Sequence, residues 1–123
     1  QVVLENEPEP LDTINISQEN LEAVKYGMYL LGTEGSVAKY FKDLPVEVGA
    51  KTGSAQVGSA DKEADAVFTL FAPYDDPEIV ISIVVEGGAS GGNLAQAAGE
   101  IVNYYFSAEH TVESVDAENT LLR

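Results

Sequence analysis

The residues with the clearest chemical potential are four consecutive ones that combine a cation, two hydroxyl groups and a glycine: Lys51, Thr52, Gly53 and Ser54. Ammonium and hydroxyl groups donate hydrogen bonds to carboxylates, and a glycine lets a ligand approach the main chain closely. The four residues lie within a β-prone segment, residues 46–57, that predicts a strand. The sequence therefore predicts an anion-binding site on a strand.

The order of these residues sets a geometric condition on such a site. Side chains alternate along a strand, so Lys51 and Gly53 share one face while Thr52 and Ser54 share the other. A site that uses both Lys51 and Thr52 requires local twist or a position at a sheet edge. The backbone N–H of Ser54 is a candidate donor to a developing oxyanion. The competing interpretation is a solvated lysine beside a strand glycine, which a lone triplet would favour because short motifs often match by chance.

Composition limits the class of protein. The chain has 123 residues, of which 45% are hydrophobic and 22% charged, enough for one small folded domain. A net charge of −15 repels phosphate backbones, so we expect no nucleic-acid partner. The absence of cysteine excludes disulfides and thiolate chemistry. The acidic turns lack the calcium-loop pattern of a central glycine and a terminal glutamate, so we expect neither a metal site nor a cofactor.

The elements that must position the site begin with a helix. We interpret residues 1–16 as an edge strand followed by an extended connector, because prolines and acidic residues follow a short β-prone start. Ser17 is a favourable N-cap, and apolar residues at helical spacing predict an amphipathic helix packed by one stripe. The stripe consists of Leu21, Val24, Met28 and Leu31. A short helical turn is predicted over residues 37–41.

Three closely spaced strands follow, at residues 46–57, 66–72 and 79–85. Their short connections imply an antiparallel meander. The third strand is apolar at nearly every position, which is typical of a strand that is covered on both faces. The glycine-rich residues 87–92 are interpreted as a flexible loop that borders the site.

A final helix completes the expected fold. Apolar residues from Leu94 to Tyr105 predict a helix with a wide apolar stripe, and Tyr104, Tyr105 and Phe106 are interpreted as packing residues. Residues 107–123 form a polar, acidic tail whose His110 is expected to be solvated. The fold class is therefore α+β, with an antiparallel sheet of three or more strands and a helix from each end of the chain packed on it.

The order of these motifs, over about residues 19–106, resembles the C-terminal part of a penicillin-binding protein transpeptidase domain. Residues 48–56 are similar to the family's Ala-Gly-Lys-Thr-Gly-Thr-Ala-Gln. The Ala72-Pro73 pair looks like the end of the family's next strand, and the sequence Val85-Glu86-Gly87-Gly88 looks like the end of the one after. Gln56 is more similar to the class B branch than to the bifunctional one.

The chain also departs from the family pattern. Val67 stands in place of a tryptophan, and Ser54 in place of the commoner threonine. The family's nucleophilic serine with a lysine three residues later, and its Ser-x-Asn motif, do not occur in a convincing context, so we expect the chain alone to be inactive. Residues 17–106 are interpreted as the C-terminal portion of the domain. Because the chain begins at Gln1, we expect it to be a piece whose nucleophile and membrane anchor lie upstream.

The resemblance implies a serine D,D-transpeptidase that cross-links peptidoglycan stem peptides through an acyl-enzyme and binds penicillin. Lys51 would act as a catalytic residue that supplies positive charge to the substrate carboxylate and to the shared proton network, and the hydroxyls of Thr52 and Ser54 would hydrogen-bond to that carboxylate. Gly53 would permit close approach, and the Ser54 N–H would contribute to the oxyanion hole. The implied partners are stem peptides, β-lactams and the remainder of the domain, on the extracytoplasmic face of a bacterial membrane. Self-association through an exposed sheet edge is also expected.

Two other classes of function stay open on the sequence. One is a β-lactam sensor or β-lactamase relative built on the same scaffold. The other is a noncatalytic acidic binding domain in which the Lys-Thr-Gly triplet is coincidental.

Overall fold

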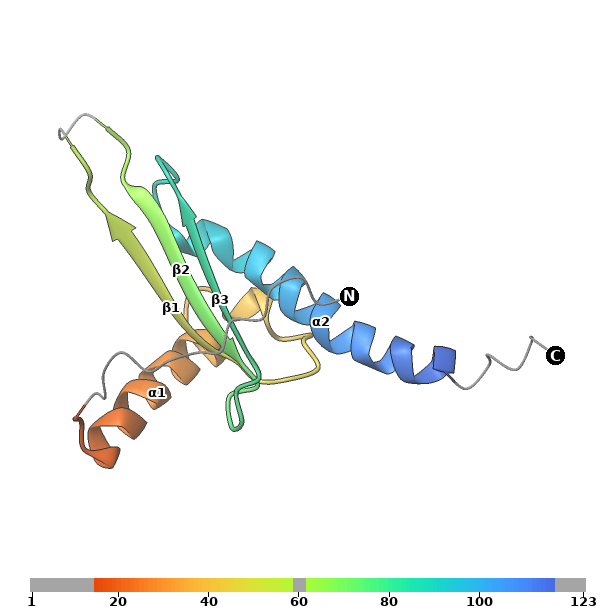
Figure 1. Ribbon diagram of the computed structural model, residues 1–123. Coiled ribbons are helices and arrows are strands. Elements are labelled where there is room, and N and C mark those ends of the chain that lie inside the picture. The colour runs from red at the N-terminus through yellow and green to blue at the C-terminus, as the bar shows by residue number, and fades with distance from the viewer. Residues whose placement is uncertain (1–14, 59–61, 117–123) are drawn as a thin grey trace, which may run out of the picture.

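The computed structural model describes residues 15–58 and 62–116. The elements follow in the order α1 (Gln18–Thr33), η1 (Ala38–Tyr40), β1 (Gly49–Ala55), β2 (Asp65–Ala72), β3 (Ile79–Val85), η2 (Gly91–Leu94) and α2 (Ala95–Asp116), where η1 and η2 are short 3₁₀ helices. The strands form one antiparallel sheet in the order β1-β2-β3 (Figure 1). The predicted α+β meander is confirmed. The edge strand expected near the start of the chain and the side chain of His110 lie outside the described residues.

The first helix begins where the N-cap residue Ser17 predicts. Fewer of its apolar residues are buried than the spacing predicts. The Ser17 hydroxyl accepts a hydrogen bond from the backbone N–H of Asn20 at 3.3 Å, which satisfies one of the free donors of the first turn. Leu21 and Val24 are nevertheless exposed, while Leu31 is half-buried against the core. The expected single packed stripe is therefore wrong for the first half of α1, whereas the second half holds the half-buried Met28 and Leu31 and the buried Gly32, which lies against Val48.

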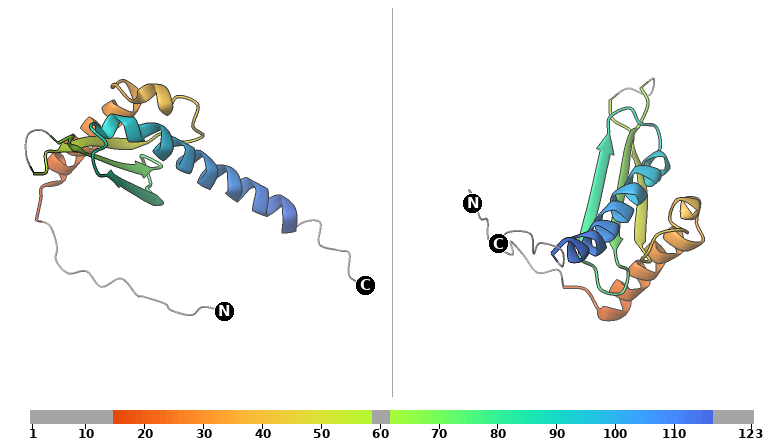
Figure 2. Two further views of the ribbon diagram at one scale, coloured as in Figure 1. Left: turned by 90° about the horizontal axis from the view of Figure 1, so that it is seen from above. Right: turned by 90° about the vertical axis from the view of Figure 1, so that its right-hand side faces the viewer.

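The core lies between one face of the sheet and the pair α2 and η1 (Figure 2). Alternate residues of β2 are fully buried on this face, and the Phe68 ring packs against Phe41 with centroids 6.2 Å apart. The helix α2 contributes residues at helical spacing: Ala95, Ala98, Val102 and Phe106. Many of the fully buried positions are alanines: Ala50, Ala66, Ala72, Ala95 and Ala98. The small side chains let α2 approach the sheet closely.

The outer face of β3 is open, contrary to the expectation that both faces are covered. Ile81 and Ile83 are half-buried on the core side, whereas Val80 and Val84 are 70% and 62% exposed on the other side. Within the described residues, β3 is an edge strand of the sheet and α2 lies over only one face. An unbroken apolar pattern cannot indicate by itself which face another part of a fold covers.

The last helix extends past its predicted end. Phe106 is buried as expected, but Tyr104 is 77% exposed, so the packing role predicted for Tyr104 is wrong. Tyr105 is exposed as well, and its ring packs edge-on against that of Phe106, with centroids 5.0 Å apart. The helical backbone continues to Asp116, and its C-terminal part projects beyond the sheet (Figure 2). In the part of the chain that the structure describes, no helix combines the length and the apolar character needed to cross a membrane.

Candidate functional site

The strand β1 presents Lys51 on the outer face of the sheet. Lys51 lies opposite Thr69 of β2, and the Thr69 hydroxyl lies 3.4 Å from that of Ser82 on β3. These three side chains form a polar row across the sheet. The Lys51 side chain is exposed, and its ammonium donates a hydrogen bond to the backbone carbonyl of Thr52. An incoming anion can replace the Thr52 carbonyl as the acceptor, and the ammonium is already exposed to it.

The two hydroxyl residues lie on the opposite face, as strand alternation predicts. Thr52 pairs with the buried Phe68 and is half-buried, whereas Ser54 pairs with Ala66 and is exposed. In the sheet that the described residues form, β1 is an edge strand. A ligand at this edge can reach side chains on both faces. The edge position therefore meets the condition that the sequence sets for joint use of Lys51 and Thr52.

Gly53 is half-buried and has close neighbours on β2 and on η2. It pairs with Val67, and a Cβ atom at Gly53 would lie 3.3 Å from the Cβ of Val67. On the core side, the backbone of Gly53 is covered by Gly91 of η2. The Val67 side chain, where the family pattern has a tryptophan, thus lies beside the glycine of the triplet.

The glycine-rich segment after β3 is fastened to the sheet and is not the flexible loop that its composition suggests. The backbone N–H of Gly87 donates to the carboxylate of Asp65 at 2.9 Å, and that of Ala89 donates to the carbonyl of Ala64 at 2.8 Å. Gly91 is buried. The segment does border the Lys-Thr-Gly strand, and the hydrogen bonds give it a defined position there.

The bare spacing of a serine and a lysine three residues later occurs at Ser36 and Lys39. Both residues are exposed, and the Lys39 ammonium lies 4.8 Å from the centroid of the Tyr40 ring. Lys39 belongs to η1, a helix of three residues. A solvated lysine over an aromatic ring is a common surface arrangement, so this pair is a weak candidate for a nucleophile and its base. The same spacing begins at Ser59, which lies outside the described residues.

Sequence reasoning missed a cluster that connects α1 to the start of β1. The Tyr29 hydroxyl donates to the Glu47 carboxylate at 2.9 Å, and this hydrogen bond is the main cause that raises the pKa of Tyr29 above its ordinary value. The Tyr29 ring lies 4.7 Å from that of Tyr74, and the Lys25 ammonium lies 5.4 Å from the Tyr74 ring. The residues are far apart in sequence, and only the spacing of Lys25 and Tyr29 along one helix face could have suggested the contact.

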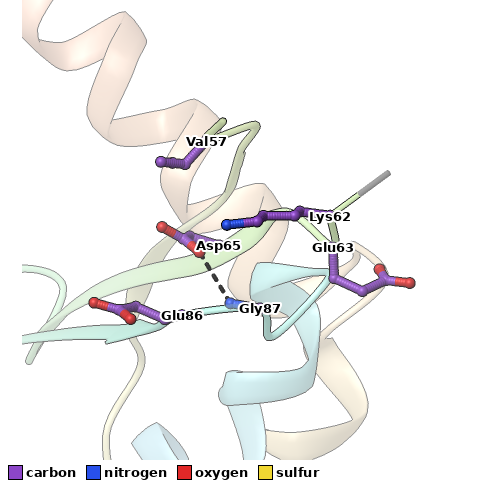
Figure 3. A pocket seen from close by; sticks show the side chains of 6 residues that line it. All are labelled: Val57, Lys62, Glu63, Asp65, Glu86 and Gly87. Atoms are coloured by element: carbon purple, nitrogen blue, oxygen red, sulfur yellow. Dashed lines mark hydrogen bonds between the residues drawn. The ribbon is translucent and has the colours of Figure 1, made fainter. Parts of the chain in front are cut away.

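A separate cavity of about 530 Å³ lies beyond the end of β1. It is lined by Val57, Lys62, Glu63, Asp65, Glu86 and Gly87 (Figure 3). Three carboxylates and one ammonium make the cavity unfavourable for an anion. Among the described residues, no group of three or more histidine or acidic side chains could hold a metal ion.

The chain matches a known protein family and curated relatives over most of its length. The family model of the penicillin-binding protein transpeptidase domain matches residues 1–105. The peptidoglycan D,D-transpeptidase MrdA of Haemophilus influenzae is 32% identical over 102 residues, which cover 70% of this chain. The chain spans 16% of that relative's length.

Two solved structures share the fold. Penicillin-binding protein PBP2 of Helicobacter pylori, in complex with MreC, matches with a TM-score of 0.66 and 27% identity over 75% of this chain and 18% of its own. PBP2 of Pseudomonas aeruginosa, in complex with WCK 5153, matches with a TM-score of 0.65 and 27% identity over 83% of this chain and 23% of its own. With a domain match over most of its length, the chain belongs to the penicillin-binding protein transpeptidase family.

Proposed function

We propose that this chain supplies the Lys-Thr-Gly strand to the active site of a peptidoglycan D,D-transpeptidase. The observation that carries the proposal is the exposed ammonium of Lys51 on an edge strand, with the hydroxyls of Thr52 and Ser54 on the adjoining positions. Membership of the transpeptidase family and similarity to proteins named D,D-transpeptidases support it further. The nucleophilic serine would come from another part of the protein.

The proposed reaction is acyl transfer in two steps. The serine hydroxyl attacks the carbonyl carbon before the terminal D-alanine of a stem peptide, and a C–O bond forms. The C–N bond breaks, and D-alanine leaves with the proton of the serine hydroxyl on its nitrogen. The amine of a second stem peptide then attacks the acyl-enzyme, which returns the serine and leaves a cross-link. Lys51 and the hydroxyls of Thr52 and Ser54 bind the terminal carboxylate in the first step. The backbone N–H of Ser54 stabilises the negative oxygen that develops at the carbonyl.

The same chemistry defines the partners of the site. A β-lactam carries a carboxylate beside a reactive amide carbonyl, so it competes for the same groups and acylates the same serine. Peptidoglycan is assembled outside the cytoplasmic membrane, so the site works on the extracytoplasmic face, held there by an anchor outside this chain. The remainder of the transpeptidase domain is the partner that completes the active site.

Replacement of Lys51 tests the proposal. In the protein that carries the nucleophile, Lys51→Ala should slow acylation by a labelled penicillin by roughly 10- to 100-fold, because a hydrogen bond to a charged group contributes about 1.5–3 kcal/mol. Lys42→Ala is the matched control, because Lys42 is an exposed lysine whose contact is with Asp43, 3.9 Å away. An unchanged rate for Lys51→Ala would refute the role of Lys51.

A further inference from the structure

Gly91 occupies a position that has no room for a side chain. A Cβ atom there would lie 2.1 Å from the carbonyl oxygen of Val67, and 2.6 and 2.8 Å from the carbonyl oxygen and nitrogen of Gly53. Real Cβ atoms essentially never come closer than 3.0 Å to such atoms. All three atoms belong to the main chain, so no change of rotamer can relieve the contact. Gly91 therefore lets η2 lie directly on the backbone of the pair Gly53 and Val67.

The segment that carries Gly91 is held in place by hydrogen bonds to residues at the beginning of β2 and by one within the segment. Before Gly91, the Gly87 and Ala89 N–H groups donate to Asp65 and to the Ala64 carbonyl, both at the start of β2. After Gly91, the side-chain amide of Asn93 donates to the Gly88 carbonyl at 3.3 Å. The first two bonds tie the segment to the beginning of β2, the Asn93 bond closes the segment on itself, and Gly91 reaches across to β1. The segment cannot retreat from a clash at Gly91 without losing them.

We propose that Gly91 is a positioning residue for the Lys-Thr-Gly strand. This inference rests on the proposed function. The close contact fixes how far the main chain at Gly53 lies from η2. Ser54 follows directly, with the N–H that donates to the oxyanion and the hydroxyl that binds the carboxylate. A methyl group at Gly91 forces the main chain of β2 away from η2 by about 0.9 Å, the difference between the 2.1 Å contact and the 3.0 Å limit, and that of β1 by a few tenths of an ångström. Displacements of about 1 Å at reacting groups can cost about 100-fold in rate.

The test compares Gly91→Ala with Gly92→Ala in the protein that carries the nucleophile. The two glycines are neighbours in η2, but a Cβ atom at Gly92 would lie 3.7 Å from the Ser90 hydroxyl and 3.8 Å from the Val37 side chain, which is ordinary contact. Gly99→Ala is a control for core strain away from β1, because its Cβ atom would lie 3.0 Å from the Tyr40 carbonyl and 3.3 Å from the Phe41 ring.

The measurement is the time course of acylation by a labelled penicillin, together with thermal unfolding. The final amount of label counts folded molecules, whereas the rate constant reports the geometry of the site. We expect Gly91→Ala to lower the rate constant by about 10- to 100-fold, with Gly92→Ala and Gly99→Ala within about twofold of the parent. The positioning role is wrong if Gly91→Ala lowers only the amount of label or the unfolding temperature, as a purely structural residue would.

A second pair of variants tests the same role if Gly91→Ala gives no folded protein. Asp65→Ala removes the acceptor of the Gly87 N–H and loosens the segment without a clash, while Asp65→Asn keeps an acceptor oxygen at the same place. We expect a rate constant several-fold lower for Asp65→Ala and its recovery in Asp65→Asn. Equal rates for Asp65→Ala and the parent would overturn the inference.

The same experiments separate this inference from the proposed function. If the parent protein is not acylated, or if Lys51→Ala reacts as fast as the parent, the proposed function fails. If Lys51→Ala is slow while Gly91→Ala reacts as fast as Gly92→Ala, only the positioning role of Gly91 fails.

Discussion

The open outer face of β3 predicts that the 123-residue chain self-associates when it is produced by itself. Val80 and Val84 are 70% and 62% exposed on this face, and β3 is an edge strand among the described residues. Exposed apolar edge strands readily pair with a second chain. We expect the average mass in solution to rise with protein concentration.

The size of the effect follows from the exposed side chains and the charge. Complete burial of a valine is worth about 1.5–3 kcal/mol, so covering the exposed part of Val80 and Val84 in both copies contributes about 4–8 kcal/mol. Association costs an estimated 4–15 kcal/mol, and the net charge of −15 on each copy adds repulsion. Pairing of the strand backbones adds a small gain. At the favourable end of both ranges the net gain is about 4 kcal/mol, so the tightest dimer to expect has a dissociation constant on the order of 1 mM, reached at high salt because salt screens the repulsion.

Sedimentation or light scattering over a range of protein and salt concentrations measures the association. The variant Val80→Lys/Val84→Lys should stay monomeric. Its control is Val24→Lys/Val57→Lys, which makes the same chemical change at valines that are 59% and 55% exposed and lie outside the strands. Both double variants reduce the negative charge equally, and that change alone would favour association. A loss seen only in the β3 variant must therefore come from its apolar surface.

Two results would refute this reasoning. One is a parent chain that remains monomeric near millimolar concentration in high salt. The other is equal association of the two double variants, which would mean that the contact lies elsewhere. Circular dichroism of each variant shows whether the comparison is between folded chains.

Two further predictions concern groups outside the Lys-Thr-Gly strand. The raised pKa of Tyr29 means that the folded state favours the neutral phenol. The hydrogen bond of Tyr29 therefore contributes fully to stability below about pH 10, the pKa in the unfolded chain, and this contribution is lost as the pH rises through the higher pKa of the folded state. Denaturant unfolding between pH 8 and pH 11 should show a steeper loss of stability in the parent than in Tyr29→Phe, and equal slopes would contradict the role of the Glu47 contact. Ser36→Ala should leave acylation by penicillin unchanged in the protein that carries the nucleophile, because Lys39 is solvated over Tyr40. Loss of acylation in Ser36→Ala would instead identify Ser36 as the nucleophile.

Local patterns in the sequence predicted the elements well. The N-cap at Ser17 marks the start of α1, and the third strand has the predicted bounds of Ile79–Val85. These features depend on neighbouring residues in the chain, through a cap hydrogen bond or an apolar run. The alternation of Lys51 and Thr52 on opposite faces also follows from strand geometry alone.

Features that depend on distant parts of the chain could not be predicted in this way. Exposure of Val80 and Val84 depends on which face of the sheet α2 covers. The apolar sequence of β3 would be the same whichever face were covered. The close packing of Gly91 on Gly53 joins residues 38 positions apart, and a glycine-rich composition indicates a flexible loop as readily as a tight contact. The roles of Lys51, Thr52, Gly53 and Ser54 stay predictions that acylation measurements can test.

The alanines between α2 and the sheet have a mechanical consequence. Alanine has no side-chain torsion that repositions heavy atoms, so the alanines of this core, Ala50, Ala72, Ala95 and Ala98, cannot absorb a shift by changing rotamers. The larger residues of the same core, Phe68, Leu70, Val102 and Phe106, do have such torsions. A displacement of α2 against the sheet would therefore be absorbed by these larger side chains and not by the alanines.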